Sequence, residues 1–238
     1  MQDKIVVIHQ PDFMPYLGFF DRLNKADIYV VLDNVQFVRW SARSWTNRDK
    51  IKTKSGEKWI TVGTKKMPRG TMINQILLSE DNDWRTENLN LLRENYRKSP
   101  YFDEIMPYLL KLYDFKGKRM IDFNLESIKM LIELFDIHTE IVIASDLDPV
   151  GKNNTLVIDI LQKMNCIKYL SGVGARDYYE PELYEKAGIE VIWQEFEHPV
   201  YPQQYDGFIP YLSSIDLLFN CGIEKSRKIL KDSLQQDV

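Results

Sequence analysis

The pattern of hydrophobic positions along the chain predicts an α/β protein. Continuous β-branched and apolar runs without polar alternation are typical of strands buried on both faces of a parallel sheet. Such runs occur at residues 5–8, 28–32, 140–144, 168–170 and 190–193. Apolar residues at helical spacing predict helices between them, at residues 18–26, 154–164 and 178–187. The alternation favours a Rossmann-like, mostly parallel sheet flanked by helices.

The segment between residues 82 and 136 departs from this alternation. Three consecutive helices are predicted there, at residues 82–97, 101–113 and 124–135. We interpret the segment as a helical insertion within a single domain covering residues 1–238. It could extend the core, cover a pocket or bind a partner. A further strand is predicted at residues 59–62, and a helix begins near residue 215.

Composition and charge narrow the function classes. The chain has 31 basic and 35 acidic residues, giving a net charge of −4, so nucleic acid is not an expected partner. One local basic cluster combines arginine and lysine with tryptophan, and it fits either a clamp for a phosphorylated ligand or a solvated face. Its residues are Arg39, Trp40, Arg43, Trp45, Arg48 and Lys50.

The chain also carries signals about its compartment. No apolar run approaches the ~20 residues of a membrane helix, and the first run is too short for a signal peptide. The two cysteines, Cys166 and Cys221, have the spacing of neither a disulfide framework nor a metal site. We therefore expect a cytoplasmic protein without membrane insertion.

Candidate chemistry gathers where the predicted strands end. Because ligands of parallel sheets bind outside the carboxyl ends of the strands, polar residues there should share one rim. Each pair is also compatible with an ordinary cap or turn. The pairs are His9-Gln10, Asp33-Asn34, Ser145-Asp146 and Ser171-Gly172.

Two of these strand ends suggest specific chemistry. His9 is a candidate general base, and the alternative is a neutral histidine bonded to a loop carbonyl. The loop after Ser171 and Gly172 could bind an anion with its backbone amides, or could be a tight turn. The three histidines lack metal-ligand spacing, so no metal is expected, and the cofactor is undetermined.

A polar C-terminal segment is a further candidate. Tyr201–Gly222 is rich in glutamine, serine and aspartate among its aromatic residues, including Tyr205 and Asp216. We expect it over the same pocket as His9. Ser213 or Ser214 could instead act as an N-cap for the helix that follows, a role worth ~1 kcal/mol.

Several sequence motifs resemble those of the WbqC-like family. The matching signatures are His9-Gln10-Pro11-Asp12-Phe13-Met14-Pro15-Tyr16-Leu17-Gly18, Asp33-Asn34-Val35-Gln36-Phe37, Asn47-Arg48, Tyr169-Leu170-Ser171-Gly172, Tyr201-Pro202-Gln203 and Ser213-Ser214-Ile215-Asp216-Leu217-Leu218-Phe219-Asn220-Cys221-Gly222. The resemblance implies a bacterial cytoplasmic protein of a family often encoded among genes for the synthesis of O-antigen or another surface glycan. It adds Gly18 and Gln36 to the candidate binding residues.

A second resemblance concerns the opening of the fold, which looks like that of the nucleotidylyltransferase superfamily. Members of that superfamily stabilise phosphates with an HxGH element. Tyr16 and Phe19 stand at the two histidine positions around Gly18 in this chain. Nucleotidyl transfer by the superfamily's mechanism is therefore not expected, although nucleotide-binding architecture is.

Two functional hypotheses follow. The first is an enzyme that transfers an acyl or aminoacyl group to a nucleotide- or lipid-linked sugar. His9 would be the base and Asp33 would orient the acceptor, while Gln10 and Asn47 would hydrogen-bond the substrate and Arg48 would pair with a phosphate or carboxylate. The second is a non-catalytic protein that binds a nucleotide-sugar or a partner on the same fold.

Overall fold

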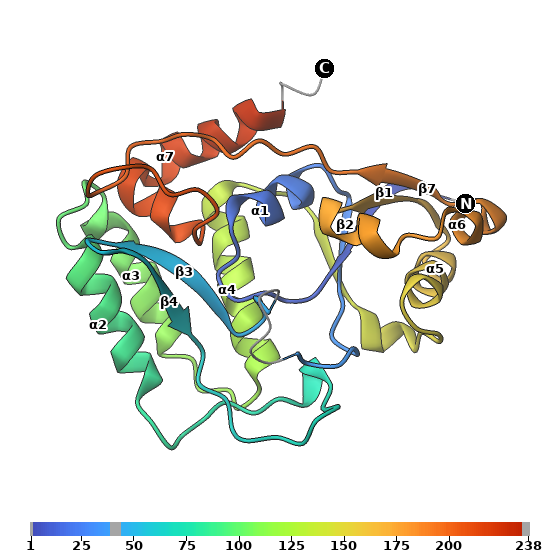
Figure 1. Ribbon diagram of the computed structural model, residues 1–238, viewed down its shortest axis with the longest axis horizontal. Coiled ribbons are helices and arrows are strands. Elements are labelled where there is room, and N and C mark those ends of the chain that lie inside the picture. Colours follow the sequence, from blue (N-terminus) through green and yellow to red (C-terminus); the bar gives the residue numbers. More distant parts are fainter. Residues whose placement is uncertain (1, 39–43, 235–238) are drawn as a thin grey trace.

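The computed structural model describes residues 2–38 and 44–234 of the chain (Figure 1). The strands are β1 (Gln2–His9), β2 (Ile28–Val31), β3 (Arg48–Thr53), β4 (Gly56–Thr61), β5 (Glu140–Ile143), β6 (Cys166–Ser171) and β7 (Glu190–Trp193). The α-helices are α1 (Leu17–Asn24), α2 (Trp84–Tyr96), α3 (Phe102–Tyr113), α4 (Met120–Phe135), α5 (Asn154–Lys163), α6 (Pro181–Ala187) and α7 (Ile215–Leu234). Short 3-10 helices cover Ile73–Gln75, Ala144–Leu147 and Val173–Tyr178.

Five strands form a parallel sheet in the order β5-β2-β1-β6-β7. Every neighbouring pair in that sheet is parallel, so all five carboxyl ends lie along one edge. The chain builds the sheet outward from β1 through β2 to β5, and then returns to add β6 and β7 on the other side of β1. The predicted Rossmann-like α/β fold is confirmed, and the strand order reverses between β1 and β6.

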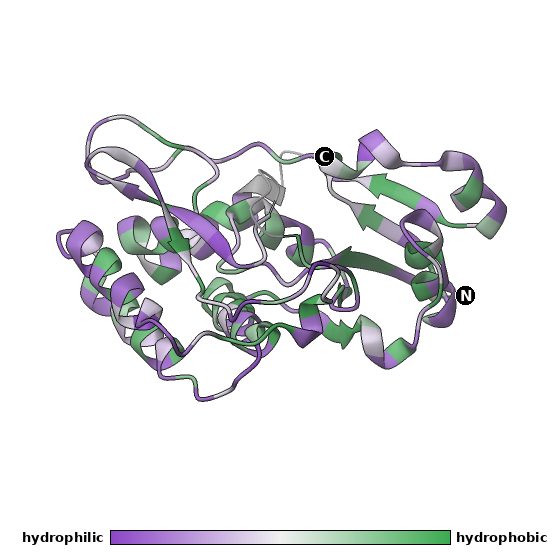
Figure 2. Cartoon of the chain, turned by 60° about the horizontal axis from the view of Figure 1, so that its bottom comes forward, coloured by the Kyte–Doolittle hydropathy of each residue, from purple (hydrophilic) through white to green (hydrophobic). Residues whose placement is uncertain are grey.

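Each face of this sheet packs against its own set of helices. Val7 of β1 belongs to a core built mainly with α1, α4 and α7, whereas Val6 and Ile8 pack with α5 and α6. Because both faces are covered, the central positions of the strands are mostly apolar, as Figure 2 shows for the sheet. The continuous hydrophobic runs in the sequence have this physical cause.

The helices α2, α3 and α4 occupy the chain between β4 and β5; α2 and α3 lie at the opposite end of the molecule from α5 and α6, and α4 lies near its middle (Figure 1). Their buried side chains, including Leu92, Leu109 and Phe123, belong to the same core as α1 and α7. This segment therefore extends the core. The prediction for α4 was four residues short, since the helix begins at Met120 rather than Asn124.

An antiparallel hairpin of β3 and β4 lies beside these helices, and only its second strand was predicted. The sequence of β3 is Arg-Asp-Lys-Ile-Lys-Thr, which lacks an apolar run, yet Asp49, Ile51 and Lys52 are all buried. Arg39, Trp40 and Arg43 of the predicted basic cluster lie outside the described residues.

None of the helices in residues 2–38 and 44–234 combines the length and the apolar character that a membrane span requires.

Candidate active site

The carboxyl ends of β1 and β6 form the crevice at which the strand order reverses. In open α/β sheets this is the position where ligands bind. His9 is the last residue of β1, Ser171 is the last residue of β6, and Gly172 follows it. The structure thus brings His9, Gln10, Ser171 and Gly172 to a common edge.

His9 is held in one orientation by its neighbours. Its Nδ1 lies 3.0 Å from the carbonyl oxygen of Gln10, which can only accept, so Nδ1 carries the proton and Nε2 the lone pair. The ring of Phe19 packs edge-on at 5.5 Å. About 35% of the His9 side chain is exposed. Burial of the rest, aided by the charge of Arg22, lowers the pKa of His9 below its ordinary value, so the imidazole is neutral at pH 7.

Asp12 lies directly behind this imidazole. Its Oδ2 is 3.6 Å from His9 Nδ1, an ion-pair distance once the ring is protonated. Burial raises the pKa of Asp12 to about 7, against the opposing effects of Arg22 and a hydrogen bond from Thr46. A carboxyl group that titrates near neutral pH is suited to proton transfer.

The loop that carries Asp12 is fixed by distant parts of the chain. Thr46 Oγ1 lies within hydrogen-bond distance of Gln10 Oε1 at 3.0 Å and of Asp12 Oδ1 at 3.4 Å. The buried Asn124 of α4 donates to the carbonyls of Pro11 and Thr46 at 2.7 and 2.6 Å. These bonds place Asp12 against His9 in advance of any ligand.

Arg22 supplies a buried positive charge beside the same crevice. It projects from α1, is 4% exposed, and donates to Gln194 Oε1 at 2.7 Å. A Cβ added to Gly172 would lie 2.8 Å from Arg22 Nη1, so this glycine allows the guanidinium to approach the end of β6. In the part of the chain that the structure describes, no carboxylate forms an ion pair with Arg22. A buried cation without an ion-pair partner is suited to an anionic ligand.

A cavity of about 490 Å³ adjoins the crevice on the side of α5. Gln10 and Ser171 stand at the strand ends that border it, and its walls are unusually rich in aromatic rings. Such walls suit a flat, partly polar ring system. The aromatic lining consists of Tyr169, Tyr178, Tyr179, Tyr184 and Trp193.

Asp33, at the end of β2, accepts hydrogen bonds from two other segments of the chain. Its carboxylate accepts from the backbone N and Oγ of Ser145 at 2.9 and 2.7 Å, and from Asn74 Nδ2 at 3.0 Å. These bonds tie β2 to the segment after β5. Gln36 is exposed and forms an isolated β-bridge with Met72.

The other residues predicted around His9 lie on neighbouring elements. Asn47 is buried next to Thr46, and Arg48 places its guanidinium 4.1 Å above the ring of Trp59. Gly18 lies in α1, where its carbonyl accepts from Gln194 Nε2 at 2.8 Å.

The C-terminal segment divides between two places. Ser213 Oγ donates to the Met14 carbonyl at 2.6 Å, so this part reaches the loop after His9. Ser213 therefore bonds to that loop rather than capping α7. Asp216, one turn further along the chain, is fully buried and accepts from the Tyr96 hydroxyl at 2.7 Å, while Tyr205 donates to the Asn95 carbonyl at 3.2 Å; both therefore face α2.

The sequence pattern that defines the WbqC-like protein family matches residues 10–228. The chain belongs to the WbqC-like protein family. Among curated proteins, the chain is similar to the uncharacterized protein Rv1507c of Mycobacterium tuberculosis, which is 28% identical over 223 residues, covering 93% of this chain and 95% of the relative. No solved structure gives a significant match. Membership suggests a role in polysaccharide biosynthesis and specifies neither substrate nor reaction.

Two residues of this WbqC-like protein were not singled out as site residues from the sequence, Asp12 and Arg22. Asp12 stands inside the family signature, but its raised pKa depends on burial that only the folded loop provides. Arg22 lies in α1 between the buried residues Phe19 and Leu23. A charged residue among the apolar positions of this helix is the sequence signal that could have identified it. Within the described residues of this WbqC-like protein, no group of three or more His, Cys, Asp or Glu could hold a metal ion.

Proposed function

We propose that this protein is a transferase that moves an acyl or aminoacyl group onto a nucleotide-linked sugar during surface-polysaccharide synthesis. The observation that carries the proposal is the His9–Asp12 pair at the crevice between β1 and β6, beside the Arg22 charge. Family membership supports the pathway.

The proposed substrate follows from the chemistry around the crevice. A nucleobase would stack among the rings of the cavity beside Gln10 and Ser171. The phosphates would lie toward the Arg22 guanidinium, because a buried cation favours charge-assisted bonds to anionic oxygen. The sugar would then extend toward His9.

The proposed reaction is direct acyl transfer from a thioester donor. The sugar's amine nitrogen attacks the donor carbonyl, a C–N bond forms, and the C–S bond breaks. His9 Nε2 accepts the amine proton and returns it to the leaving thiolate. Asp12, 3.6 Å from Nδ1, stabilises the imidazolium that forms in between when its own carboxyl group is ionised, at and above about pH 7. In this scheme Asp33 is a positioning residue that ties β2 to the segment after β5.

The test has a binding arm and a turnover arm. Thermal-shift measurements identify which nucleotide-linked amino sugars stabilise the protein, and mass spectrometry then detects acylated product with a panel of acyl and aminoacyl thioesters. His9→Ala should lower kcat by at least about 100-fold, the usual contribution of a general base. His138→Ala is the matched control, since its side chain is 89% exposed.

Two results would contradict the proposal. Full turnover by the His9→Ala variant would show that His9 is not the general base. Tight binding of a nucleotide-sugar without product from any donor would favour the alternative hypothesis, a non-catalytic binding protein.

A further inference from the structure

A second cavity, of about 390 Å³, lies at the turn of the β3–β4 hairpin. The turn, the C-terminal end of α2 and the loop at residues 204–205 form its walls. The six-residue strand β3 separates it from Thr46, which bonds to Gln10 and Asp12 in the crevice, a span of about 20 Å at the usual rise per residue. It is therefore a separate site from the crevice.

The charges around this cavity are unbalanced. Lys54, Arg97 and Lys98 line it together with a single carboxylate, Glu94. The three cations are exposed, and within residues 2–38 and 44–234 none of them makes an ion pair. Such an excess of positive charge is unexpected in a chain whose net charge is −4.

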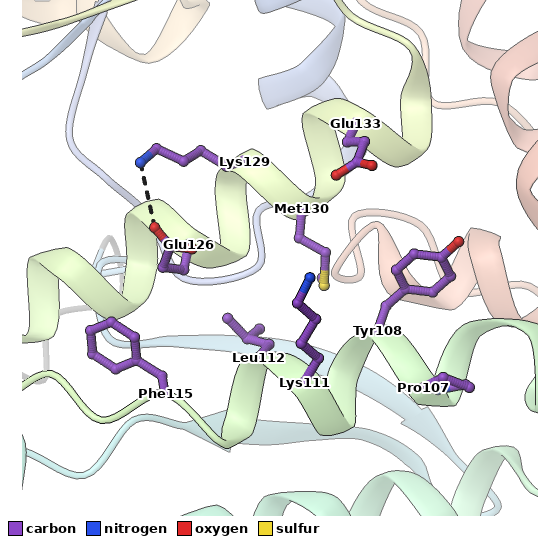
Figure 3. A pocket seen from close by; sticks show the side chains of 9 residues that line it. All are labelled: Pro107, Tyr108, Lys111, Leu112, Phe115, Glu126, Lys129, Met130 and Glu133. Atoms are coloured by element: carbon purple, nitrogen blue, oxygen red, sulfur yellow. Dashed lines mark hydrogen bonds and ion pairs between the residues drawn. The ribbon is translucent and has the colours of Figure 1, made fainter.

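The groove between α3 and α4 shows the contrast (Figure 3). Its volume is similar, about 420 Å³, but two lysines and two glutamates balance around an apolar floor. Lys129 pairs with Glu126 there at 3.4 Å. That groove lacks the unbalanced charge of the hairpin cavity.

A buried amide donor also borders the hairpin cavity. Gln204 lines it, and Gln204 Oε1 accepts from Ser99 Oγ at 2.9 Å. Gln204 Nε2 is buried and has no acceptor among the described residues. A buried donor left without an acceptor is destabilising, so a turn of this amide toward the cavity, where an oxyanion could accept from it, would be favourable.

The wall that carries this amide is held in place from several directions. The backbone N of Gln204 donates to Asn220 Oδ1 at 3.1 Å, and the Tyr205 hydroxyl donates to the Asn95 carbonyl at 3.2 Å. Tyr205 adopts a φ of 63°, which non-glycine residues rarely do. The position of the wall is thus defined by the fold itself.

The helix dipole explains only part of this arrangement. Basic residues are favoured at helix C-termini, which accounts for Arg97 and Lys98 after α2. It does not account for Lys54, which comes from the hairpin turn, or for the buried amide of Gln204. An anionic ligand accounts for all four.

We propose that the hairpin cavity binds the phosphate or diphosphate group of a phosphorylated ligand, through Lys54, Arg97, Lys98 and the Gln204 amide. The ligand is either a soluble phosphate compound or a lipid headgroup. This site does not depend on the transferase reaction proposed above, because its residues are separate from His9, Asp12 and Arg22.

The first test follows backbone amides by NMR during titration with inorganic pyrophosphate at low salt. The amides of Lys54, Gln204 and Tyr205 should shift and saturate. The triple variant Lys54→Gln, Arg97→Gln and Lys98→Gln should bind at least about tenfold more weakly. A matched triple variant of exposed cations elsewhere should keep its affinity: Lys66→Gln, Arg69→Gln and Lys228→Gln.

The outcomes separate this site from the crevice. Shifts confined to the amide of Gly172, or equal affinity in both triple variants, would overturn the proposal, as would no saturable shift at all. His9→Ala should leave the shifts at Gln204 unchanged, so failure of the transferase proposal would not mimic failure here.

A second experiment identifies the source of the phosphate. Phosphatidylcholine vesicles with and without phosphatidic acid are sedimented with the wild type and the triple variant. Retention that requires both phosphatidic acid and the three cations assigns a lipid headgroup. Pyrophosphate binding without vesicle retention assigns a soluble ligand, and binding of neither probe refutes the site.

Discussion

Replacing Asp12 by asparagine should stabilise the protein, and increasingly so as the pH rises. The Asp12 side chain is 13% exposed, and its pKa in the folded protein is raised from 3.8 to about 7. Between these values the unfolded chain is ionised at this position while the folded protein holds the proton. The wild type therefore loses stability as the pH rises from about 4 to about 7, and asparagine removes this loss.

The magnitude follows from the size of the pKa shift. A shift of about three units at about 1.4 kcal/mol per unit corresponds to about 4 kcal/mol above pH 7. His9 acts with the opposite sign, since its lowered pKa makes stability rise with pH in part of the same range. The wild-type curve alone mixes the two effects. The difference between variant and wild type isolates Asp12, because below pH 7 the carboxyl group is neutral and asparagine resembles it.

Denaturant unfolding, followed by tryptophan fluorescence, measures this difference at about pH 5, 6, 7 and 8. The gain in the free energy of unfolding should increase by about 1.4 kcal/mol per pH unit up to pH 7 and then level off. Asp103→Asn, at the start of α3, controls for the loss of one carboxylate from an exposed position. A gain that is independent of pH, or a loss at every pH, would refute the assignment of a buried, proton-holding carboxyl group.

Three further predictions concern the crevice and α7. Gly172→Ala should weaken nucleotide-sugar binding about tenfold in calorimetry, because its new Cβ would lie 2.8 Å from Arg22 Nη1 and the buried guanidinium must shift away. Gly174→Ala, whose Cβ meets no atom within 4 Å, should leave that affinity unchanged. Arg22→Met should raise the pKa of His9, read from the imidazole NMR signals, because the guanidinium charge lowers it. Gly222→Ala should cost about 2 kcal/mol or more in denaturant unfolding, because the backbone there has φ 72° and ψ 171°.

The parallel sheet could be predicted from the sequence because its physical cause is local. Strands covered on both faces are apolar at their central positions, so β1, β2, β5 and β7 each contain a continuous apolar run. β3 could not be predicted in this way, since Lys52 is buried by directing its Nζ to the carbonyls of Tyr205 and Gly207, more than 150 residues away.

The candidate site was predictable in position but not in chemistry. The rule for parallel strands located His9 and Ser171 at one edge. The acid–base partner of His9 depends on Thr46 and Asn124, which lie 34 and 113 residues along the chain from the segments they bind. The sequence from His9 to Gly18 contains no pattern that reveals the burial of Asp12. Asp33 lies at the same edge, but its bonds to Ser145 emerge only when β2 and β5 pair.

The hydrogen bond between Ser213 and Met14 has a consequence for the order of events during synthesis. It joins residues 199 positions apart, and Tyr16 pairs with Ser213 in an isolated β-bridge at the same place. Met14 holds a φ of 44°, a conformation that a residue with a side chain rarely keeps without support. During synthesis the ribosome makes this loop long before it makes Ser213. The loop therefore lacks its hydrogen bond to Ser213 while the sheet assembles. The loop that carries Asp12 thus reaches its final form only after Ser213 has emerged.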